Sequence, residues 1–166
     1  LDVLIRDNTW LFGENFHITL HEAGLSKVMN RVAAELNEKK ARKKTKKPDG
    51  KTGRIDCFLG RSVPNSDPKK REYFVVELKR PSLVVGRKEL NQLHDYVNAL
   101  KAQSDFANTD TFWHFYLVTG EYSDLIKDDV VQVNRPPGLV SDNANSKVWV
   151  KTWAEIIRDS EARLNF

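Results

Sequence analysis

Two short apolar segments, residues 54–59 and 73–79, constrain the fold of this chain most strongly. Both are rich in β-branched and aromatic residues, and a polar stretch with two prolines separates them, a pattern typical of strand, loop and strand. Side chains alternate between the two faces of a strand, so we expect Glu77 and Lys79 to project side by side. Asp56 should lie next to Glu77 if the strands pair. The opposite face of the first strand would carry Ile55, Cys57 and Leu59.

An Asp on one strand and Glu-x-Lys on the next suit magnesium-dependent hydrolysis of phosphodiesters. Mg²⁺ prefers oxygen ligands and takes only one or two carboxylates from a protein. The ion makes a bound water easier to deprotonate, and a neighbouring lysine can stabilise the anionic transition state. Asp56 and Glu77-Leu78-Lys79 resemble the signature of the PD-(D/E)XK nuclease superfamily. The resemblance implies that Asp56 and Glu77 hold Mg²⁺ or Mn²⁺ and that Lys79 positions the water; an ordinary half-exposed strand end is the alternative interpretation.

A helix is expected after the second strand, because apolar residues recur there at helical spacing. These residues are Leu90, Leu93, Val97 and Leu100. Gln92 and Tyr96 are four apart and therefore share one face of this helix. Gln-x-x-x-Tyr soon after Glu-x-Lys resembles a further motif of the RecB-like branch of the same superfamily. Three motifs in this order are more specific than any one of them, and the resemblance implies that Gln92 and Tyr96 support the site.

Many nucleases of this superfamily also carry an acidic residue from a helix that precedes the first core strand. Glu14 follows a short apolar segment that ends at Gly13, and it is our candidate for that role. Glu22 and Glu35 are rivals for it. His17 and His21 are four apart and could hold zinc on a helix, but no further His or Cys ligands accompany them, so we expect packing or surface histidines.

The positive charge of the chain is concentrated in one segment. Residues 39–54 contain nine basic residues and one acidic residue, so the remainder, with 18 basic and 22 acidic residues, carries a formal charge of −4. Residues 39–53 are therefore interpreted as a basic insert, which is either a solvated loop or a contact for the nucleic-acid backbone. The candidate contacts are Lys43, Lys44, Lys46, Lys47 and Arg54.

The remaining pattern predicts an α/β fold with a central mixed sheet and flanking helices. Residues 25–36 read as an amphipathic helix, and residues 111–122 read as an aromatic strand that should lie in the sheet centre. Residues 134–146 read as a loop from their Pro, Gly, Asn and Ser content, and a last strand follows. Thr152 with Glu155 three residues later predicts a capping box that starts the final helix.

Composition sets outer limits on these expectations. At 166 residues, the chain fits one domain, and 40% apolar with 30% charged residues is typical of a globular protein. No run of eighteen apolar residues occurs, so we expect no membrane span and a cytoplasmic location. Cys57 is the one cysteine and should be a small buried hydrophobe. The first residue is Leu, so we expect a fragment of a longer protein.

Four segments together resemble the nuclease domain of Shedu-type bacterial anti-phage defence proteins. They read WLFGENF, VELKRP, QLHDYVNAL and KTWAEII. The resemblance implies a restriction-endonuclease-like fold and a metal-dependent DNA endonuclease, fused to a sensing region and assembled as a homo-oligomer. The basic insert at residues 39–53 departs from the family. The sequence leaves open a catalytically silent DNA-binding or assembly module, and it leaves open RNA as the substrate.

Overall fold

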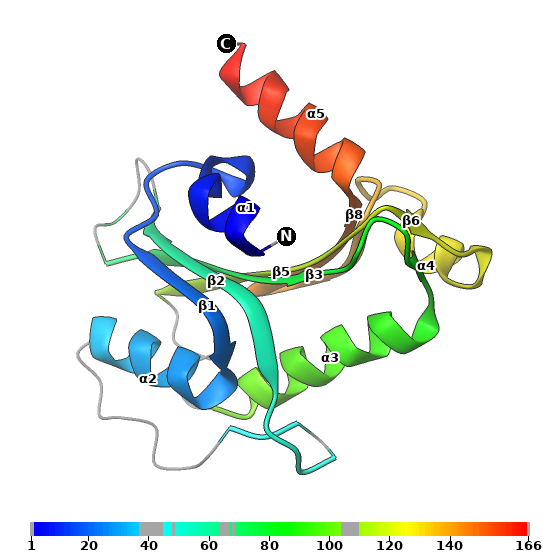
Figure 1. Ribbon diagram of the computed structural model, residues 1–166. Helices are drawn as coiled ribbons and strands as arrows, with labels where there is room; N and C mark the ends of the chain where they lie inside the picture. The colour runs from blue at the N-terminus through cyan, green and yellow to red at the C-terminus, as the bar shows by residue number, and fades with distance from the viewer. Residues whose placement is uncertain are drawn as a thin grey trace.

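The molecule is organised around one mixed β-sheet with helices on both faces (Figure 1). The structure is a computed structural model and describes residues 2–36, 45–47, 49–63, 67, 69–103 and 110–165. Within these residues the sheet has six strands in the order β1-β2-β3-β5-β8-β7. In that order the strands are Ile18–Gly24, Arg54–Ser62, Arg71–Leu78, Thr111–Thr119, Ser146–Thr152 and Leu139–Asn143.

The strand directions confirm the predicted mixed sheet. β1, β2 and β3 pair antiparallel, β3, β5 and β8 pair parallel, and β7 closes the other edge antiparallel to β8. The aromatic strand β5 lies between β3 and β8, at the sheet centre, as its apolar sequence predicted. A separate pair, β4 (Val84–Val85) and β6 (Glu121–Tyr122), runs parallel beyond the ends of β3 and β5.

Two pairs of helical elements cover the two faces of the sheet. Figure 1 shows α2 (Leu25–Glu35) and α3 (Arg87–Lys101) on one face, and α1 (Asp2–Asp7) and α5 (Trp153–Leu164) on the other. The predicted capping box is present at the start of α5, where Thr152 Oγ1 accepts from the Glu155 amide at 3.2 Å. The short helices are η1 (Thr9–Phe12), η3 (Asp124–Ile126) and α4 (Lys127–Val130). The described part of the chain contains no helix with the length and apolarity needed to cross a membrane.

Strand alternation divides the core into two clusters. The cluster under α2 and α3 contains Phe58, Tyr73 and Val75, and the cluster under α1 and α5 contains Cys57 and Phe74. All five are buried, and Cys57 is a buried free thiol as expected. Each fully buried large apolar side chain stabilises the fold by about 1.5–3 kcal/mol, so both faces are held firmly against the sheet.

The structure departs from the sequence analysis in two predictions and adds one strand that was not predicted. Residues 18–24, which we did not assign as a strand, form β1, and residues 139–143 of the predicted loop form β7. Each is an edge strand, and pairing with its one neighbour overrides its weak local strand preference. Ile55 packs with Phe58 instead of sharing a face with Cys57. The ladder is irregular at this level, because Glu22 of β1 has φ of +46° and no pair stands between His21–Cys57 and Ala23–Ile55.

Candidate active site

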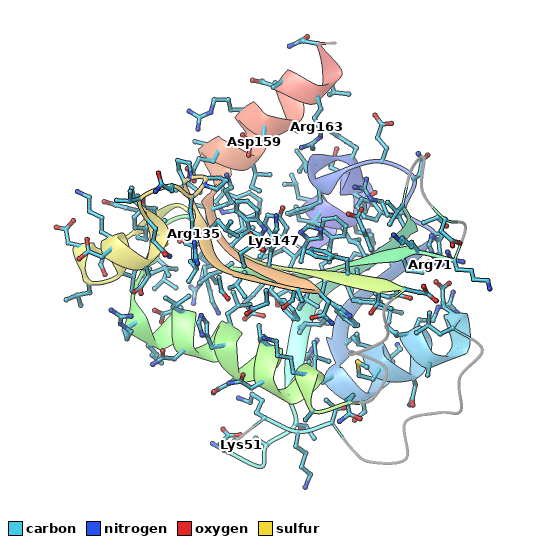
Figure 2. The ribbon with its side chains drawn as sticks, turned by 180° about the vertical axis from the view of Figure 1, so that it is seen from behind. Lys51, Arg71, Arg135, Lys147, Asp159 and Arg163 are labelled. Atoms are coloured by element: carbon cyan, nitrogen blue, oxygen red, sulfur yellow. The ribbon has the colours of Figure 1, made fainter. Side chains whose placement is uncertain are left out.

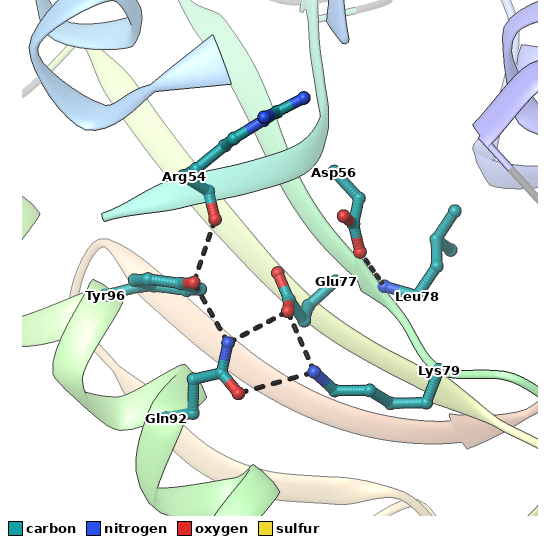
Figure 3. Close-up of polar contacts among 7 residues, drawn as sticks. All are labelled: Arg54, Asp56, Glu77, Leu78, Lys79, Gln92 and Tyr96. Atoms are coloured by element: carbon teal, nitrogen blue, oxygen red, sulfur yellow. Dashed lines mark hydrogen bonds and ion pairs between the residues drawn. The ribbon is translucent and has the colours of Figure 1, made fainter. Parts of the chain in front are cut away.

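The Asp56 carboxylate lies where β2 and β3 stop pairing. Their ladder runs from Ser62 opposite Arg71 to Cys57 opposite Val76, and the next position along β2 is Asp56. Asp56 Oδ2 accepts a hydrogen bond of 2.7 Å from the Leu78 amide, as Figure 3 shows. The carboxylate therefore bridges to β3 beyond the end of the ladder and is fixed beside Glu77.

Glu77 is the buried acid of the site, with 5% of its surface exposed. Its Oε1 accepts from Lys79 Nζ at 2.9 Å and from Gln92 Nε2 at 3.1 Å (Figure 3). Its Oε2 is buried and has no hydrogen-bond partner in the described residues. Both donors converge on a single oxygen, so the other oxygen is left for a further ligand.

Gln92 and Tyr96 project from α3 toward the same point. Gln92 Oε1 lies 3.4 Å from Lys79 Nζ, and Gln92 Nε2 donates to the Tyr96 hydroxyl at 3.0 Å. Tyr96 in turn donates to the Arg54 carbonyl at 2.8 Å, which ties α3 to the start of β2 (Figure 3). A Cβ on Gly53 would lie 2.9 Å from the Tyr96 ring, so glycine at this position allows the close approach.

The backbone of Lys79 is fixed on both sides. Its amide donates to the Val118 carbonyl at 2.8 Å, and its carbonyl accepts from Trp153 Nε1 at 3.4 Å. The side chain is largely buried, with 15% exposed. Lys79 is therefore oriented by the sheet, by Glu77 and by Gln92 together.

Burial raises the pKa of Glu77 above its ordinary value, and the nearby charge of Asp56 raises it further. The hydrogen bond and charge of Lys79 act in the opposite direction, followed by the charge of Lys47. Burial likewise raises the pKa of Tyr96, so its hydroxyl remains a neutral donor. Two carboxylates close together in a partly dry site favour a cation between them.

The donor set fits a hard divalent cation. Asp56 and Glu77 each have one oxygen held by protein donors, and neither Asp56 Oδ1 nor Glu77 Oε2 bonds to any described residue. Mg²⁺ usually keeps several waters and takes one or two carboxylates, so two acids suffice. No group of three or more His, Cys, Asp or Glu side chains lies together as a metal ligand set in the described residues.

Glu14 is not brought to this group. Arg61 Nη1 donates to the Glu14 carbonyl at 3.3 Å, and the guanidinium of Arg61 lies over the ring of Phe74 on the opposite face of the sheet. Arg61 is five residues from Asp56 along β2, a separation of about 16 Å. Glu14 therefore lies too far away to share a ligand with Asp56.

Neither rival acid completes the site as a third carboxylate. Glu22 lies on β1, at the level of Asp56 on the neighbouring strand β2, and forms an ion pair with Arg54. Glu35 bonds to His17 at 2.8 Å, at the far end of α2. His17 directly precedes the edge strand β1 and His21 lies within it, so the two histidines are not on a helix. His21 Nδ1 and Nε2 are buried and have no hydrogen-bond partner in the described residues.

The face with Glu14 carries a separate cavity of about 690 Å³. Glu72 on its wall accepts from Arg61 Nε at 2.8 Å and lies 3.5 Å from His114 Nε2. The hydrogen bond to His114, followed by Arg61, lowers the pKa of Glu72, so it is ionised at neutral pH. Arg163 of α5, labelled in Figure 2, closes another wall and donates to the Leu11 carbonyl at 2.7 Å.

The end of the basic insert approaches the site. Lys43 and Lys44 lie outside the described residues. Lys46 is exposed, and Lys47 Nζ lies 5.9 Å from the centre of the Tyr96 ring. Lys51, labelled in Figure 2, lies next to Lys47, whose amide donates to the Lys51 carbonyl at 2.9 Å. The described part of the segment thus adds positive charge beside the acidic pair.

The sequence located Asp56, Glu77, Lys79, Gln92 and Tyr96, and the structure brings all five together. The sequence did not predict that the Leu78 amide orients Asp56, or that Gly53 allows the close approach of Tyr96. A glycine directly before a strand was the available signal for close backbone approach.

No protein-family model, curated protein or solved structure matches the chain. The functional argument therefore depends on the site itself.

Proposed function

We propose that this chain is a metal-dependent nuclease of the PD-(D/E)XK type, with a restriction-endonuclease-like fold, that hydrolyses phosphodiester bonds in DNA. The observation that carries the proposal is the pair of fixed carboxylates, Asp56 and Glu77, beside Lys79, each with one oxygen that accepts from no donor among the described residues. Three sequence motifs far apart along the chain supply the residues of this one group. The role as effector of an anti-phage defence protein is part of the proposal and depends on the sequence resemblance.

Each side chain has a distinct part in the proposed reaction. Asp56 Oδ1 and Glu77 Oε2 would hold Mg²⁺ or Mn²⁺, which supplies Lewis acidity to water and to the phosphoryl group when bound. Lys79 Nζ, already oriented by two acceptors, would stabilise negative charge that develops on the phosphoryl oxygens. Gln92 and Tyr96 act as positioning residues because they hold Glu77 and Lys79 in place.

Cleavage of supercoiled plasmid with Mg²⁺, Mn²⁺ or EDTA tests the proposal. Asp56→Asn and Glu77→Gln keep the side-chain shape and remove one ligand charge each, so cutting should be lost in both. Glu161→Gln is a matched control on the exposed surface of α5, and it should cut like the wild type. Glu14→Gln should also retain cutting, because Glu14 lies on the other face of the sheet. Undiminished cutting by both site variants would refute the assignment.

A titration of Mg²⁺ by calorimetry gives a readout that does not depend on turnover. Wild type and the Glu161→Gln control should bind the ion. Asp56→Asn and Glu77→Gln should bind it about tenfold more weakly or worse, because each has lost one charged ligand. DNA binding without cleavage in either metal would instead assign the chain as a catalytically silent module. Cutting of RNA but not DNA would reassign the substrate.

A further inference from the structure

A groove of about 440 Å³ lies between helix α2 and the edge strand β1. Lys27 and Arg31 line it from α2, Thr19 lines it from β1, and no carboxylate lines it. Neither cation makes an ion pair or a side-chain hydrogen bond with any described residue. The groove therefore presents two uncompensated positive charges.

These two cations are four residues apart on α2 and share one helical face. Like charges at this spacing disfavour a helix, and an anion bound between them would remove the repulsion. The acid of α2, Glu35, is already engaged by His17 at 2.8 Å and by Arg71 at 3.9 Å. Arg71 is labelled in Figure 2 near the C-terminal end of α2. Glu35 does not line the groove, and its carboxylate is already engaged by His17, which lines the groove at this end, and by Arg71.

The other wall of the groove is an outer strand of the sheet. β1 pairs with β2 on one side, and no strand of the described residues pairs with its other side. An edge strand presents main-chain amides to solvent, and amides are common donors to phosphate oxygens. The groove thus lies beside an unpaired strand edge as well as two side-chain cations.

The Lys27 end of the groove is the end nearer the candidate active site. α2 begins directly after Gly24, which pairs with Arg54 at the start of β2, and the Leu25 amide donates to the Gly53 carbonyl at 3.1 Å. The distance from Asp56 to Arg54 is about 7 Å along the strand. Lys27 lies about 3 Å beyond Leu25 along the helix axis. Lys27 and Arg31 are about 6 Å apart along that axis, so each cation can reach a different phosphate of one strand.

We propose that the groove between α2 and β1 binds the phosphodiester backbone of a polynucleotide flanking the cleavage point. Lys27 and Arg31 each contact one phosphate, and the backbone continues past the ion pair of Arg54 with Glu22 to Asp56. That the bound strand flanks a cleavage point rests on the proposed nuclease function. That the groove binds a phosphate backbone is independent of that function.

The test compares Lys27→Ala/Arg31→Ala with wild type by fluorescence anisotropy in EDTA, at several salt concentrations, on duplex DNA, single-stranded DNA and single-stranded RNA. Loss of two phosphate contacts should reduce the slope of log K against log salt by about 1.8 on duplex and about 1.4 on single strands. On duplex DNA, raising salt from about 50 to about 200 mM should then weaken wild type about 12-fold more than the variant. The polymer with the full reduction identifies the backbone recognised.

Lys127→Ala/Arg158→Ala is the matched control, because both residues are exposed cations without ion pairs in the described residues and lie on α4 and α5. Its slope should equal that of wild type. The proposal that the groove binds phosphates would be overturned by either of two results: an unchanged slope in Lys27→Ala/Arg31→Ala on all three polymers, or an equal reduction in the control. A wild-type protein that binds through the groove yet cuts nothing in Mg²⁺ or Mn²⁺ refutes the nuclease function alone.

Discussion

Tyr96→Phe isolates the hydroxyl that joins α3 to the start of β2. The hydroxyl donates to the Arg54 carbonyl at 2.8 Å and accepts from Gln92 Nε2 at 3.0 Å, and Tyr96 is 4% exposed. Phenylalanine keeps the ring and its apolar contacts, so the substitution removes two hydrogen bonds and little else. At about 1 kcal/mol each, their loss should lower the free energy of unfolding by about 2 kcal/mol.

For a chain of this length, 1 kcal/mol corresponds to about 2–4 °C in Tm, so Tyr96→Phe should melt about 4–8 °C below wild type. Thermal and urea unfolding followed by circular dichroism measure both quantities. The urea m-value should remain that of wild type, because the buried area is unchanged.

Tyr73→Phe is the matched control for this substitution. Tyr73 is fully buried, and its hydroxyl has no hydrogen-bond partner in the described residues. Removal of an unsatisfied buried hydroxyl should leave stability equal to or above that of wild type. The reasoning fails if Tyr96→Phe melts with wild type, or if both variants lose the same stability.

Two further predictions concern Lys79 and Glu72. Lys79→Ala should lower kcat by about 10²–10³-fold with a smaller effect on DNA affinity, because its proposed interaction develops in the transition state; equal losses in single-turnover rate and in Kd would mark it as a plain phosphate contact. Glu72→Gln should lower the free energy of unfolding at pH 7 by about 1–2 kcal/mol, since the carboxylate bonds to Arg61 and His114. The pKa of Glu72 is lowered in the fold from its ordinary 4.5, so this stability is present above pH 4.5 and disappears as pH falls through the folded-state pKa. Urea unfolding across this range should show the variant and wild type converging in acid, and a constant difference would contradict the assignment.

The sequence by itself determined the local elements with strong periodicity. The apolar stripe of residues 25–36 predicted α2, and Thr152 with Glu155 predicted the start of α5. The aromatic run at residues 111–122 predicted the central strand, which ends at Thr119. Alternation also placed Glu77 and Lys79 on one face. These predictions succeeded because each depends on side-chain spacing within one element, which the sequence states directly.

Only the tertiary structure decided which acids meet. Glu14 precedes the first site strand as the resemblance requires, but it lies with Arg61 on the other face of the sheet. Which face a connecting segment reaches depends on how the chain crosses the sheet, and spacing carries no information on that. The edge strands β1 and β7 likewise acquire their conformation from one paired neighbour.

The orientation of the site residues also required the fold. Asp56 is fixed by an amide of the neighbouring strand, and Glu77 receives donors from its own strand and from α3. The sequence supplied residue types suited to metal and phosphate chemistry. The pairing of β2 with β3 and the packing of α3 beneath them decided which carboxylate oxygens are held by the protein and which remain for a ligand, because those bonds join segments distant along the chain.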